Sequence, residues 1–423
     1  MSTQAAAVAG SVDPIAEALG HLGEEPLTEE RVAEHIFPLF RRVLDRDEIY
    51  LSNHSLGRPP DRMAEDVRRG IDAWYMEMDA AWSIWLEEHE SYRASIAALI
   101  GCSNPNAIAP KTSAGQALRA VLNALPNNQP RVVATRGEFD SIDFVLKTYA
   151  AKNRIEPRWV EGDEHGYFHA GRAIAEIDAG VDLVVISQVM FVTGQVMKEL
   201  GAVIDAAHEA GALVLMDTYH SAGAMPVGFD RLGPDFAIGG NYKYTRGGPG
   251  ACWLAIHPRH FAAARTPSPG DLATLDTGWF AKEEPLAFGR SPEAVLAPGG
   301  DAWLEATPPV LTYFQAKAGL DVTLGIGVDR IRKYNCEQQA FLVDQLRSHG
   351  VEPTLFEPRG AFLLVHDYDA FQLSARLSER GVNTDARCCP VTGRGYVRLC
   401  PDILTTRDEM ARAAEIFADT RQG

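Results

Sequence analysis

Two residues that could bind a cofactor follow neighbouring apolar runs of the sequence. Asp217 ends the run ALVLMD, with His220 three residues further on, and Lys243 follows the next run, DFAIGG, by three residues. A carboxylate at the end of a buried strand needs a partner that favours its charge, and a protonated ring nitrogen of a cofactor would serve. Burial would lower the pKa of the lysine toward that of a reactive amine. Each residue also has an ordinary interpretation, because the aspartate could equally cap a turn and a loop lysine is more often a surface residue.

Two hydroxyl residues, Thr112 and Ser113, precede an amphipathic helical pattern over residues 115–125. The first turn of a helix presents free N–H groups and the positive end of the helix dipole, which suit a single phosphate group. The chain lacks both the GxxxxGK pattern of ATP-binding loops and a GxGxxG after a strand, so a nucleotide site is disfavoured. Taken alone, the two hydroxyls are more typical of a simple helix cap.

Together these residues match what pyridoxal phosphate (PLP) requires. Lys243 offers the amine for a Schiff base, Asp217 an anion for the pyridine nitrogen, and the start of the helix a cradle for the phosphate. A turn rich in glycine at residues 247–250 lets the backbone approach a ligand closely beside the lysine. The combination therefore predicts a PLP site.

The elements that must position these residues alternate between apolar runs and helical patterns from residue 106 to 258. Apolar strands separated by helices are typical of a mainly parallel sheet covered on both faces, whose ligands gather at the carboxyl ends of the strands. The predicted strands are 131–135, 182–187, 212–217, 235–240 and 251–257, and the predicted helices include 115–125 and 199–211. After residue 309 a long helical region, strand-like runs at 361–367 and 396–400 and further helices predict a smaller α+β domain.

Composition disfavours several classes of protein. The 423 residues are 46% hydrophobic and 23% charged, as in ordinary globular chains, and the formal net charge of -17 opposes binding to nucleic acid. The six cysteines form no CxxC pair, so neither a disulfide framework nor a metal site is expected. Residues 1–14 do not resemble a signal peptide, and no apolar stretch is long enough to span a membrane. We therefore expect a soluble cytoplasmic protein that acts on a small molecule and has no nucleic-acid or membrane partner.

Several motifs, in the same order along the chain, resemble those of kynureninase, a family in the class-V, fold-type-I group of PLP enzymes. The most specific is DTYHSAG followed by NYKYTRGGPG, which is similar to the family's Asp-x-x-His, Tyr-Lys-Tyr and Gly-Pro-Gly pattern. Weaker matches are YLSNHSLG at 50–57, SQVMFVTGQ at 187–195, GWFAKE at 278–283, ATPP at 306–309, DAR at 385–387 and VRLCP at 397–401. The resemblance covers nearly the whole chain. It implies an α/β fold with a mainly parallel seven-stranded sheet flanked by helices, a large PLP-binding domain at 61–315 and a small α+β domain formed by 1–60 and 316–423.

The resemblance also implies roles for individual residues. Lys243 would carry the cofactor, Asp217 would keep its ring nitrogen protonated, and Tyr242 would contact the phosphate and be a candidate acid or base. The residues expected to bind the substrate are Arg398, which would grip its α-carboxylate, with His54 and Ser55. The other cofactor contacts implied are Thr112, Ser113, Phe139, Asp140, Ser187, His220, Trp279 and Thr307; Phe139 would stack on the ring, and Trp279 and Thr307 would come from the partner subunit of a homodimer.

The implied reaction is hydrolysis of the Cβ–Cγ bond of kynurenine or 3-hydroxykynurenine to an anthranilate and alanine, within tryptophan catabolism. His54 stands where the family has asparagine, and Met190 and Val192 replace polar or aromatic residues, so a related aryl-ketone substrate is an alternative. A class-V aminotransferase, or a cysteine desulfurase or other lyase on the same fold, is a second alternative. For the adjacent cysteines at 388 and 389 a packing role is favoured, because they do not reproduce the desulfurase spacing. A binding protein without activity is disfavoured because it would not need Lys243.

Overall fold

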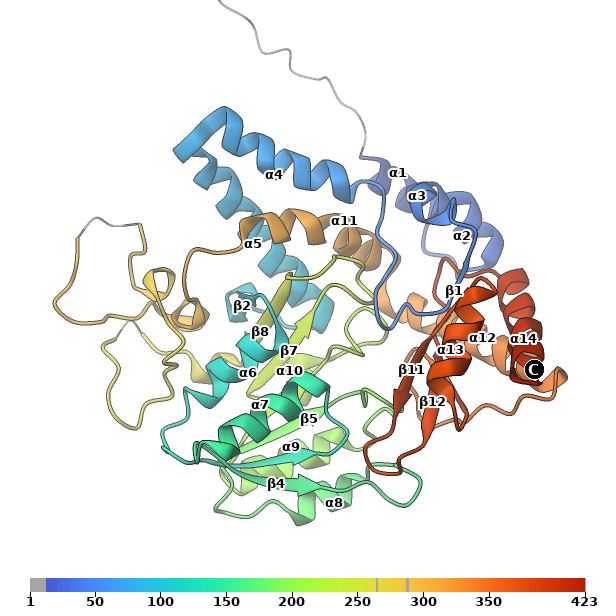
Figure 1. The fold of residues 1–423 in the computed structure, drawn as a ribbon. Helices are drawn as coiled ribbons and strands as arrows, with labels where there is room; N and C mark the ends of the chain where they lie inside the picture. The colour runs from blue at the N-terminus through green and yellow to red at the C-terminus, as the bar shows by residue number, and fades with distance from the viewer. Residues whose placement is uncertain (1–12, 264, 287–288, 423) are drawn as a thin grey trace, which may run out of the picture.

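A seven-stranded sheet forms the centre of the computed structural model, which describes residues 13–263, 265–286 and 289–422 (Figure 1). The strands lie in the order β2-β8-β7-β6-β5-β3-β4, and within this sheet β8 alone runs against the others. Their bounds are β2 Ile108–Lys111, β3 Arg131–Thr135, β4 Glu156–Val160, β5 Leu183–Ser187, β6 Leu213–Asp217, β7 Phe236–Gly240 and β8 Cys252–Ile256. The mainly parallel seven-stranded sheet is thus confirmed. Residues 1–12, on which most of the signal-peptide prediction rests, lie outside the described residues.

Five of these strands lie within one residue of their predicted bounds, whereas β2 and β4 do not follow from the hydrophobic pattern. Both are edge strands: β2 contains Pro110 and Lys111, and β4 begins Glu-Pro-Arg. A proline cannot donate to the hydrogen-bond ladder, so it is tolerated mainly at an edge, where strands are also more polar. The two edges therefore lack the apolar run by which the inner strands are recognised.

Helices cover both faces of the sheet, because successive strand residues point into two different cores. Val184 and Val214 pack into one core, and Val185 and Leu215 pack into the other. The first core includes residues of α5 (Ala81–Ile100), α8 (Ala170–Ala175), α9 (Leu200–Glu209) and α11 (Val310–Ile326), and the second includes residues of α6 (Ala114–Leu122) and α7 (Asp140–Ala151). The helix α6 begins one residue before its predicted start and ends three residues early.

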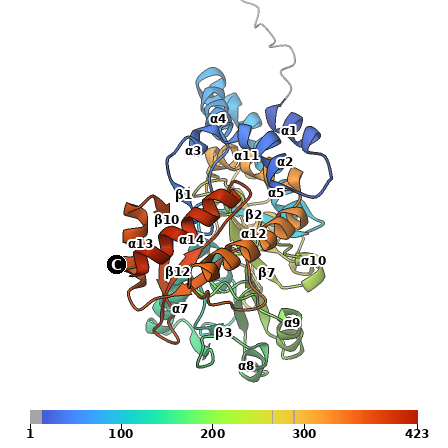
Figure 2. The ribbon, with the colours of Figure 1, turned by 90° about the vertical axis from the view of Figure 1, so that its right-hand side faces the viewer.

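A smaller antiparallel sheet is built from the C-terminal part of the chain. In it β12 (Gly395–Leu399) lies between β11 (Asp385–Cys388) and β9 (Leu363–His366). Apolar residues of three helices cover it, namely α12 (Val328–Ser348), α13 (Ala370–Glu379) and α14 (Arg407–Gln422). Figure 2 shows α12 and α14 lying side by side on this part of the molecule.

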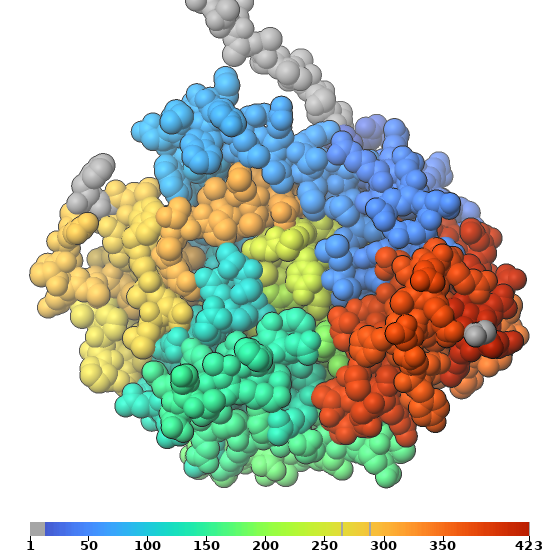
Figure 3. Space-filling view, viewed as in Figure 1, coloured from blue at the N-terminus to red at the C-terminus, as the bar shows by residue number. Residues whose placement is uncertain are grey.

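The N-terminal segment lies against the C-terminal part of the chain, as the blue and red regions of Figure 3 show. β1 (Ile49–Tyr50) pairs in parallel with β10 (Val382–Asn383), and Ser52 forms a bridge with Cys400. The helices α1 (Pro14–Leu22), α2 (Glu29–His35) and α3 (Arg41–Leu44) precede this strand, and apolar residues of α1 and α2 pack with α11 and α12. The loop after β1 then crosses to the large sheet, where the Gly57 backbone donates to the Tyr242 carbonyl oxygen at 2.8 Å.

The helical region expected after residue 309 is divided into α11 and α12 at Gly327, whose φ of +91° favours glycine. The predicted domain limit at residue 315 falls inside α11, and the division of the chain at 60 and 315 stays a prediction. Across the described ranges, none of the helices combines the length and the apolar character needed to cross a membrane.

Candidate active site

The carboxyl ends of two central strands bring Asp217 and Lys243 to one edge of the sheet. Asp217 is the last residue of β6, and Lys243 follows the neighbouring strand β7 by three residues. Both side chains are buried, with 4% exposure each. Burial raises the pKa of Asp217 and lowers the pKa of Lys243, and the opposite charge of each residue counters the shift of the other. Lys243 is therefore closer to a neutral, reactive amine than an exposed lysine is.

Hydrogen bonds continue from Lys243 to His220 and Tyr244. Lys243 Nζ lies 2.8 Å from His220 Nε2, and His220 Nδ1 lies 3.2 Å from Tyr244 Oη. Burial and the positive charge of Lys243 lower the pKa of His220 well below its usual value, so the ring is neutral. A neutral ring that accepts a hydrogen bond at Nε2 carries its proton on Nδ1 and can donate it to Tyr244.

Three aromatic rings surround the amine of Lys243 and account for its desolvation. The ring centroids of Phe139, Tyr219 and Tyr242 lie 5.4, 5.5 and 5.5 Å from Nζ. Burial also raises the pKa of Tyr242, so its hydroxyl keeps its proton at neutral pH. Tyr242 is expected to contact the phosphate and to act as an acid or a base. A protonated hydroxyl fits the role of an acid or hydrogen-bond donor better than that of a base.

The residues predicted to bind phosphate lie at the same edge of the sheet. Cys252 of β8 is the register partner of the last residues of both β2 and β7. Thr112 and Ser113 follow β2 directly, and both are exposed. Ser113 is the N-cap of α6 and accepts a hydrogen bond from the Gln116 backbone at 3.1 Å. The other first-turn amides of a helix have no carbonyl partner within it, so this helix start has donors for an anion.

Arg398, the residue predicted to bind a carboxylate, is buried on β12 between two acceptors. Its Nε and Nη2 each lie 2.7 Å from Asp385 Oδ1, and its Nη1 donates to the Phe191 carbonyl oxygen at 2.7 Å. Three of the five guanidinium N–H groups are then used, which leaves one on each terminal nitrogen for a further carboxylate. The positive charge of Arg398 also lowers the pKa of Lys243, after the larger effect of burial. The two cations thus act within one site.

His54 and Ser55 lie on the loop that follows β1. His54 is fully buried, its Nε2 is 3.6 Å from Asp385 Oδ1, and in the described part of the chain neither ring nitrogen has a hydrogen-bond partner. Burial and the positive charge of Arg398 lower the pKa of His54 to about 3, so its ring is neutral. Ser55 is half-buried and lines a hollow of about 350 Å3 with Asp385 and Arg387. The loop therefore brings both predicted substrate residues to the side of the site that holds Asp385.

Ser187 lies next to Asp217, its register partner on β6, and contacts a residue that the sequence reasoning missed. Ser187 Oγ donates to Glu138 Oε2 at 2.5 Å, and Glu138 is buried in the turn between β3 and α7. Burial raises the pKa of Glu138 to about 7. A signal for this residue was available, because it directly precedes Phe139 and follows a predicted strand by three residues.

Asp140, Trp279 and Thr307, three further predicted cofactor contacts, have other surroundings in the described ranges. Asp140 is exposed at the first residue of α7. Trp279 Nε1 donates to Thr307 Oγ1 at 3.1 Å, and the Trp279 ring packs edge-on against other aromatic rings. The protomer therefore holds Trp279 and Thr307 together.

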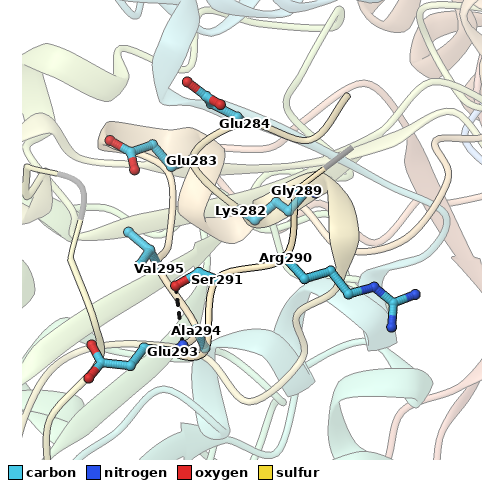
Figure 4. Close-up of a pocket in the computed structure, with 9 residues that line it drawn as sticks. All are labelled: Lys282, Glu283, Glu284, Gly289, Arg290, Ser291, Glu293, Ala294 and Val295. Atoms are coloured by element: carbon cyan, nitrogen blue, oxygen red, sulfur yellow. Dashed lines mark hydrogen bonds between the residues drawn. The ribbon is translucent and has the colours of Figure 1, made fainter. Parts of the chain in front are cut away.

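A second hollow, shown in Figure 4, contains none of the predicted site residues. It is lined by residues 282–284, 289–291 and 293–295, and inside it the Glu293 backbone donates to Ser291 Oγ at 3.2 Å. The described residues also contain no group of three or more histidine, cysteine, aspartate or glutamate side chains suited to a metal ion. The strand ends, rather than the hollows of the surface, therefore locate the candidate site.

Comparison with known proteins identifies similar sequences and structures for the chain that carries this site. A family model described as Aminotransferase class-V matches residues 83–359. The kynureninase of Geobacillus thermodenitrificans is 27% identical over 401 residues, which cover 90% of each chain. The kynureninase of Salinispora tropica is 28% identical over 410 residues, which cover 88% of this chain and 90% of the relative.

Solved structures share the fold at lower identity. A mutant of a protein named C-DES, with glycine covalently linked to its PLP cofactor, matches with a TM-score of 0.77 at 19% identity, covering 90% of this chain and 98% of its own. A cysteine desulfurase from Thermococcus onnurineus matches with a TM-score of 0.74 at 18% identity, covering 91% and 98%. These likenesses establish a fold-type-I architecture with its central sheet between layers of helices.

Proposed function

The chain belongs to the class-V aminotransferase family, and we propose that it is a PLP-dependent hydrolase that cleaves the Cβ–Cγ bond of kynurenine, 3-hydroxykynurenine or a related aryl-ketone amino acid. The observation that carries the proposal is the buried pair of Asp217 and Lys243, with Arg398 acting on the lysine through its charge. The substrate class is supported by kynureninases that are similar to 88–90% of the chain. The products would be an anthranilate and alanine.

The residues of the site fit PLP. Lys243 supplies a buried amine with a lowered pKa. The Asp217 carboxylate accepts a hydrogen bond from the Tyr219 backbone at 2.7 Å and, within the described ranges, has no cation at ion-pair distance, so it has capacity for a cationic ring nitrogen. The start of α6 supplies donors for the phosphate. The residues proposed to complete the contacts are Thr112, Ser113, Phe139, Asp140, Ser187, His220 and Tyr242, with Trp279 and Thr307 of a second subunit.

Bound PLP would supply a cationic ring that accepts electrons from Cα of the substrate. Arg398 would bind the substrate α-carboxylate through its two unused N–H groups and so hold Cα near Lys243. Because its pKa is lowered, Lys243 Nζ can take up the proton from Cα and release it again. Tyr242 holds a proton on Oη and can donate it. Overall, kynurenine and water give anthranilate and alanine.

The other class-V reactions remain the second candidates. The T. onnurineus protein shares the fold and is named a cysteine desulfurase. Such a reaction requires a thiol that can reach the substrate. Of the two adjacent cysteines, Cys389 is buried, which disfavours it, whereas Cys388 is exposed at the end of β11. An aminotransferase would use the same lysine without breaking the carbon–carbon bond. Both alternatives are distinguished by their products.

We also propose a homodimer with shared active sites. Trp74, Tyr75, Met76 and Met78, at the end of α4 (Met63–Glu77), each expose more than half of the side chain. A concentration of exposed apolar residues marks a protein interface more often than ordinary surface. Trp279 and Thr307 contact each other through an exposed hydrogen bond, so both are accessible to a second subunit.

A cytoplasmic location and a role in tryptophan catabolism are further parts of the proposal. They are supported by the free state of the six cysteines and by the similarity to kynureninases. The net charge of -17 argues against nucleic acid as a partner.

The test is product analysis. Purified protein supplied with PLP should release alanine and anthranilate from kynurenine, or alanine and 3-hydroxyanthranilate from 3-hydroxykynurenine. Parallel reactions contain cysteine with a reductant, or an amino acid with a keto acid. Sulfide release, or amino transfer without carbon–carbon cleavage, would contradict the hydrolase assignment.

Lys243→Ala should abolish the visible absorbance of covalently bound PLP and lower kcat by at least about a thousandfold, because the reactive amine is removed. Lys147→Ala is the matched control, since Lys147 is an exposed lysine that pairs with Asp143 on α7. This control should keep both the spectrum and the rate. An unchanged spectrum in Lys243→Ala would overturn the assignment of the lysine.

A further inference from the structure

Glu138 is a buried carboxylate that the proposed reaction does not use. Its Oε1 accepts hydrogen bonds from Thr135 Oγ1 at 2.6 Å and from the Ser187 backbone at 3.2 Å. Its Oε2 accepts a hydrogen bond from Ser187 Oγ at 2.5 Å. No cationic side chain pairs with Glu138 within the described part of the chain, and 4% of the residue is exposed. A buried acid without a cation is costly, which points to a role in the site.

Glu138 lies directly behind the proposed cofactor site. Ser187, to which it is hydrogen-bonded, is the register partner of Asp217. The backbone N–H of the next residue, Gln188, donates to the Asp217 carbonyl oxygen at 2.9 Å. Phe139, the next residue, has its ring centroid 5.4 Å from Lys243 Nζ. Burial and, to a smaller extent, the charge of Asp217 raise the pKa of Glu138, so the two acids share one environment.

The geometry also fixes what Ser187 can do. A hydroxyl group has a single proton. Ser187 uses it in the hydrogen bond that it donates to Glu138, so its oxygen can only accept a further hydrogen bond. Two donors hold Glu138 Oε1 as an acceptor, so a proton on this carboxyl would lie on Oε2 and reverse the bond to Ser187. The charge of Glu138 therefore determines whether Ser187 accepts or donates toward a ligand.

We propose that Glu138 is a positioning residue that orients Ser187 and adds a second negative charge behind Asp217, which stabilises the protonated form of bound PLP. This inference rests on the PLP part of the proposed function and is independent of the substrate. When a cationic ring pairs with Asp217, the repulsion between the two acids is relieved, which favours the ionised form of Glu138. The other titratable and charged groups around the site are Asp217, Tyr219, His220, Tyr242, Lys243 and Tyr244 of the large sheet, and His54, Asp385, Arg387 and Arg398 on the opposite side.

Glu138→Gln tests the charge, because it keeps the shape of the side chain. Bound PLP changes its visible absorbance when it loses a proton, and in Glu138→Gln this change should occur about one pH unit lower than in the wild type. The dissociation constant of PLP should rise about fivefold, which corresponds to the loss of a moderate electrostatic contribution. Both measurements use holoenzyme and PLP alone, so they remain valid if kynurenine proves not to be the substrate.

Two control variants separate charge from packing. Glu138→Asp keeps the charge and should return the transition toward the wild-type pH. Thr135→Val removes one hydrogen bond to Glu138 but no charge, and it should leave the transition within about 0.3 pH unit. An unchanged transition in folded Glu138→Gln holoenzyme would overturn the proposal, and so would an equal shift in Thr135→Val. If Glu138→Gln does not bind PLP, Ser187→Ala replaces it: loss of the acceptor oxygen that Glu138 orients toward the ligand should lower the transition pH, and no change would overturn the proposal.

Discussion

Lys243 and Asp217 stand close to each other in a buried site, and each is the main source of opposite charge for the other. Two charged groups taken out of water are costly unless further hydrogen bonds hold them, and here Asp217 accepts only a backbone N–H while Lys243 contacts a neutral histidine. Without cofactor the pair can become neutral if the lysine loses a proton and the aspartate gains one. A cationic ring beside Asp217 would restore its charge and leave Lys243 as the base.

Glu138 should make a contribution to the stability of the cofactor-free protein that falls as the pH rises from about 4.5 to about 7. Its pKa is raised from 4.5 to about 7 by burial, so the folded protein binds a proton that the unfolded chain releases. The contribution is complete below the unfolded pKa, is lost as the pH passes the folded pKa, and is on the order of 3 kcal/mol.

Urea unfolding of the cofactor-free protein at pH 5 and pH 8 measures this effect. The unfolding free energy at pH 8, relative to that at pH 5, should be higher in Glu138→Gln than in the wild type, because the contribution of Glu138 that is lost with rising pH is absent. Glu164→Gln, which changes an exposed glutamate, should leave that difference as it is. Equal pH dependence in all three proteins would show that Glu138 is charged in the cofactor-free fold.

At the scale of elements, the loop between β1 and α4 is pressed against the segment that carries the lysine. The Gly57 backbone donates to the Tyr242 carbonyl oxygen, and a Cβ atom at Gly57 would lie 1.9 Å from the Lys243 carbonyl oxygen. A distance that short cannot be tolerated, so only glycine lets the two segments approach. The loop that holds His54 is thereby fixed beside the amine.

Gly57→Ala should therefore displace the loop. We expect at least a tenfold loss of kcat/KM and a decrease in unfolding free energy of about 1–3 kcal/mol, typical of an overpacked site. Gly20→Ala is the matched control, because a Cβ atom at Gly20 meets nothing within 4 Å and the residue lies inside the helix α1. It should be neutral or slightly stabilising. Steady-state kinetics with thermal unfolding check both variants, and a fully active Gly57→Ala would contradict the close approach.

The same scale explains how far the sequence could predict the site. The sequence could predict that Asp217 and Lys243 lie at one site, because Asp217 ends one apolar strand and Lys243 follows the next. Neighbouring parallel strands end at one edge of the sheet. The ion pair of Asp385 with Arg398 could not be predicted from the spacing of these residues, because it depends on the antiparallel register of β11 and β12. Glu138 was missed for a similar reason, since its partner Ser187 is distant in sequence and lies on β5, which is beside β3 in the sheet although β4 comes between them in the chain.

At the scale of the whole molecule, the proposed dimer should depend on the exposed apolar residues at the end of α4. In light scattering the wild-type protein should have twice the 46.1 kDa mass of the chain. Trp74→Glu combined with Met76→Glu should shift it toward monomer, because charges in an apolar interface are costly when buried. Tyr368→Glu is the control, since Tyr368 is fully exposed near the small sheet, and it should remain a dimer.

Mixing of two inactive variants tests whether the subunits of the proposed dimer share their active sites. Lys243→Ala and Trp279→Ala dimers should each have little activity, but dissociating and mixing them in equal amounts should restore about a quarter of the wild-type rate, because half of the dimers then contain one intact site. Subunit exchange is first verified by mass. If activity then does not recover, Trp279 serves its own protomer.

The pairing of β1 with β10 and of Ser52 with Cys400 has a consequence for how the protein is made. The loop that carries His54 and Gly57 leaves the ribosome early, yet its strand partners are synthesised only near the end of the chain. Because N-terminal regions generally fold first, the large sheet with its lysine can form while this loop still lacks them. A chain interrupted before Arg398 would thus carry the reactive amine without the residue proposed to bind the substrate carboxylate. Completion of translation and completion of the catalytic site therefore coincide.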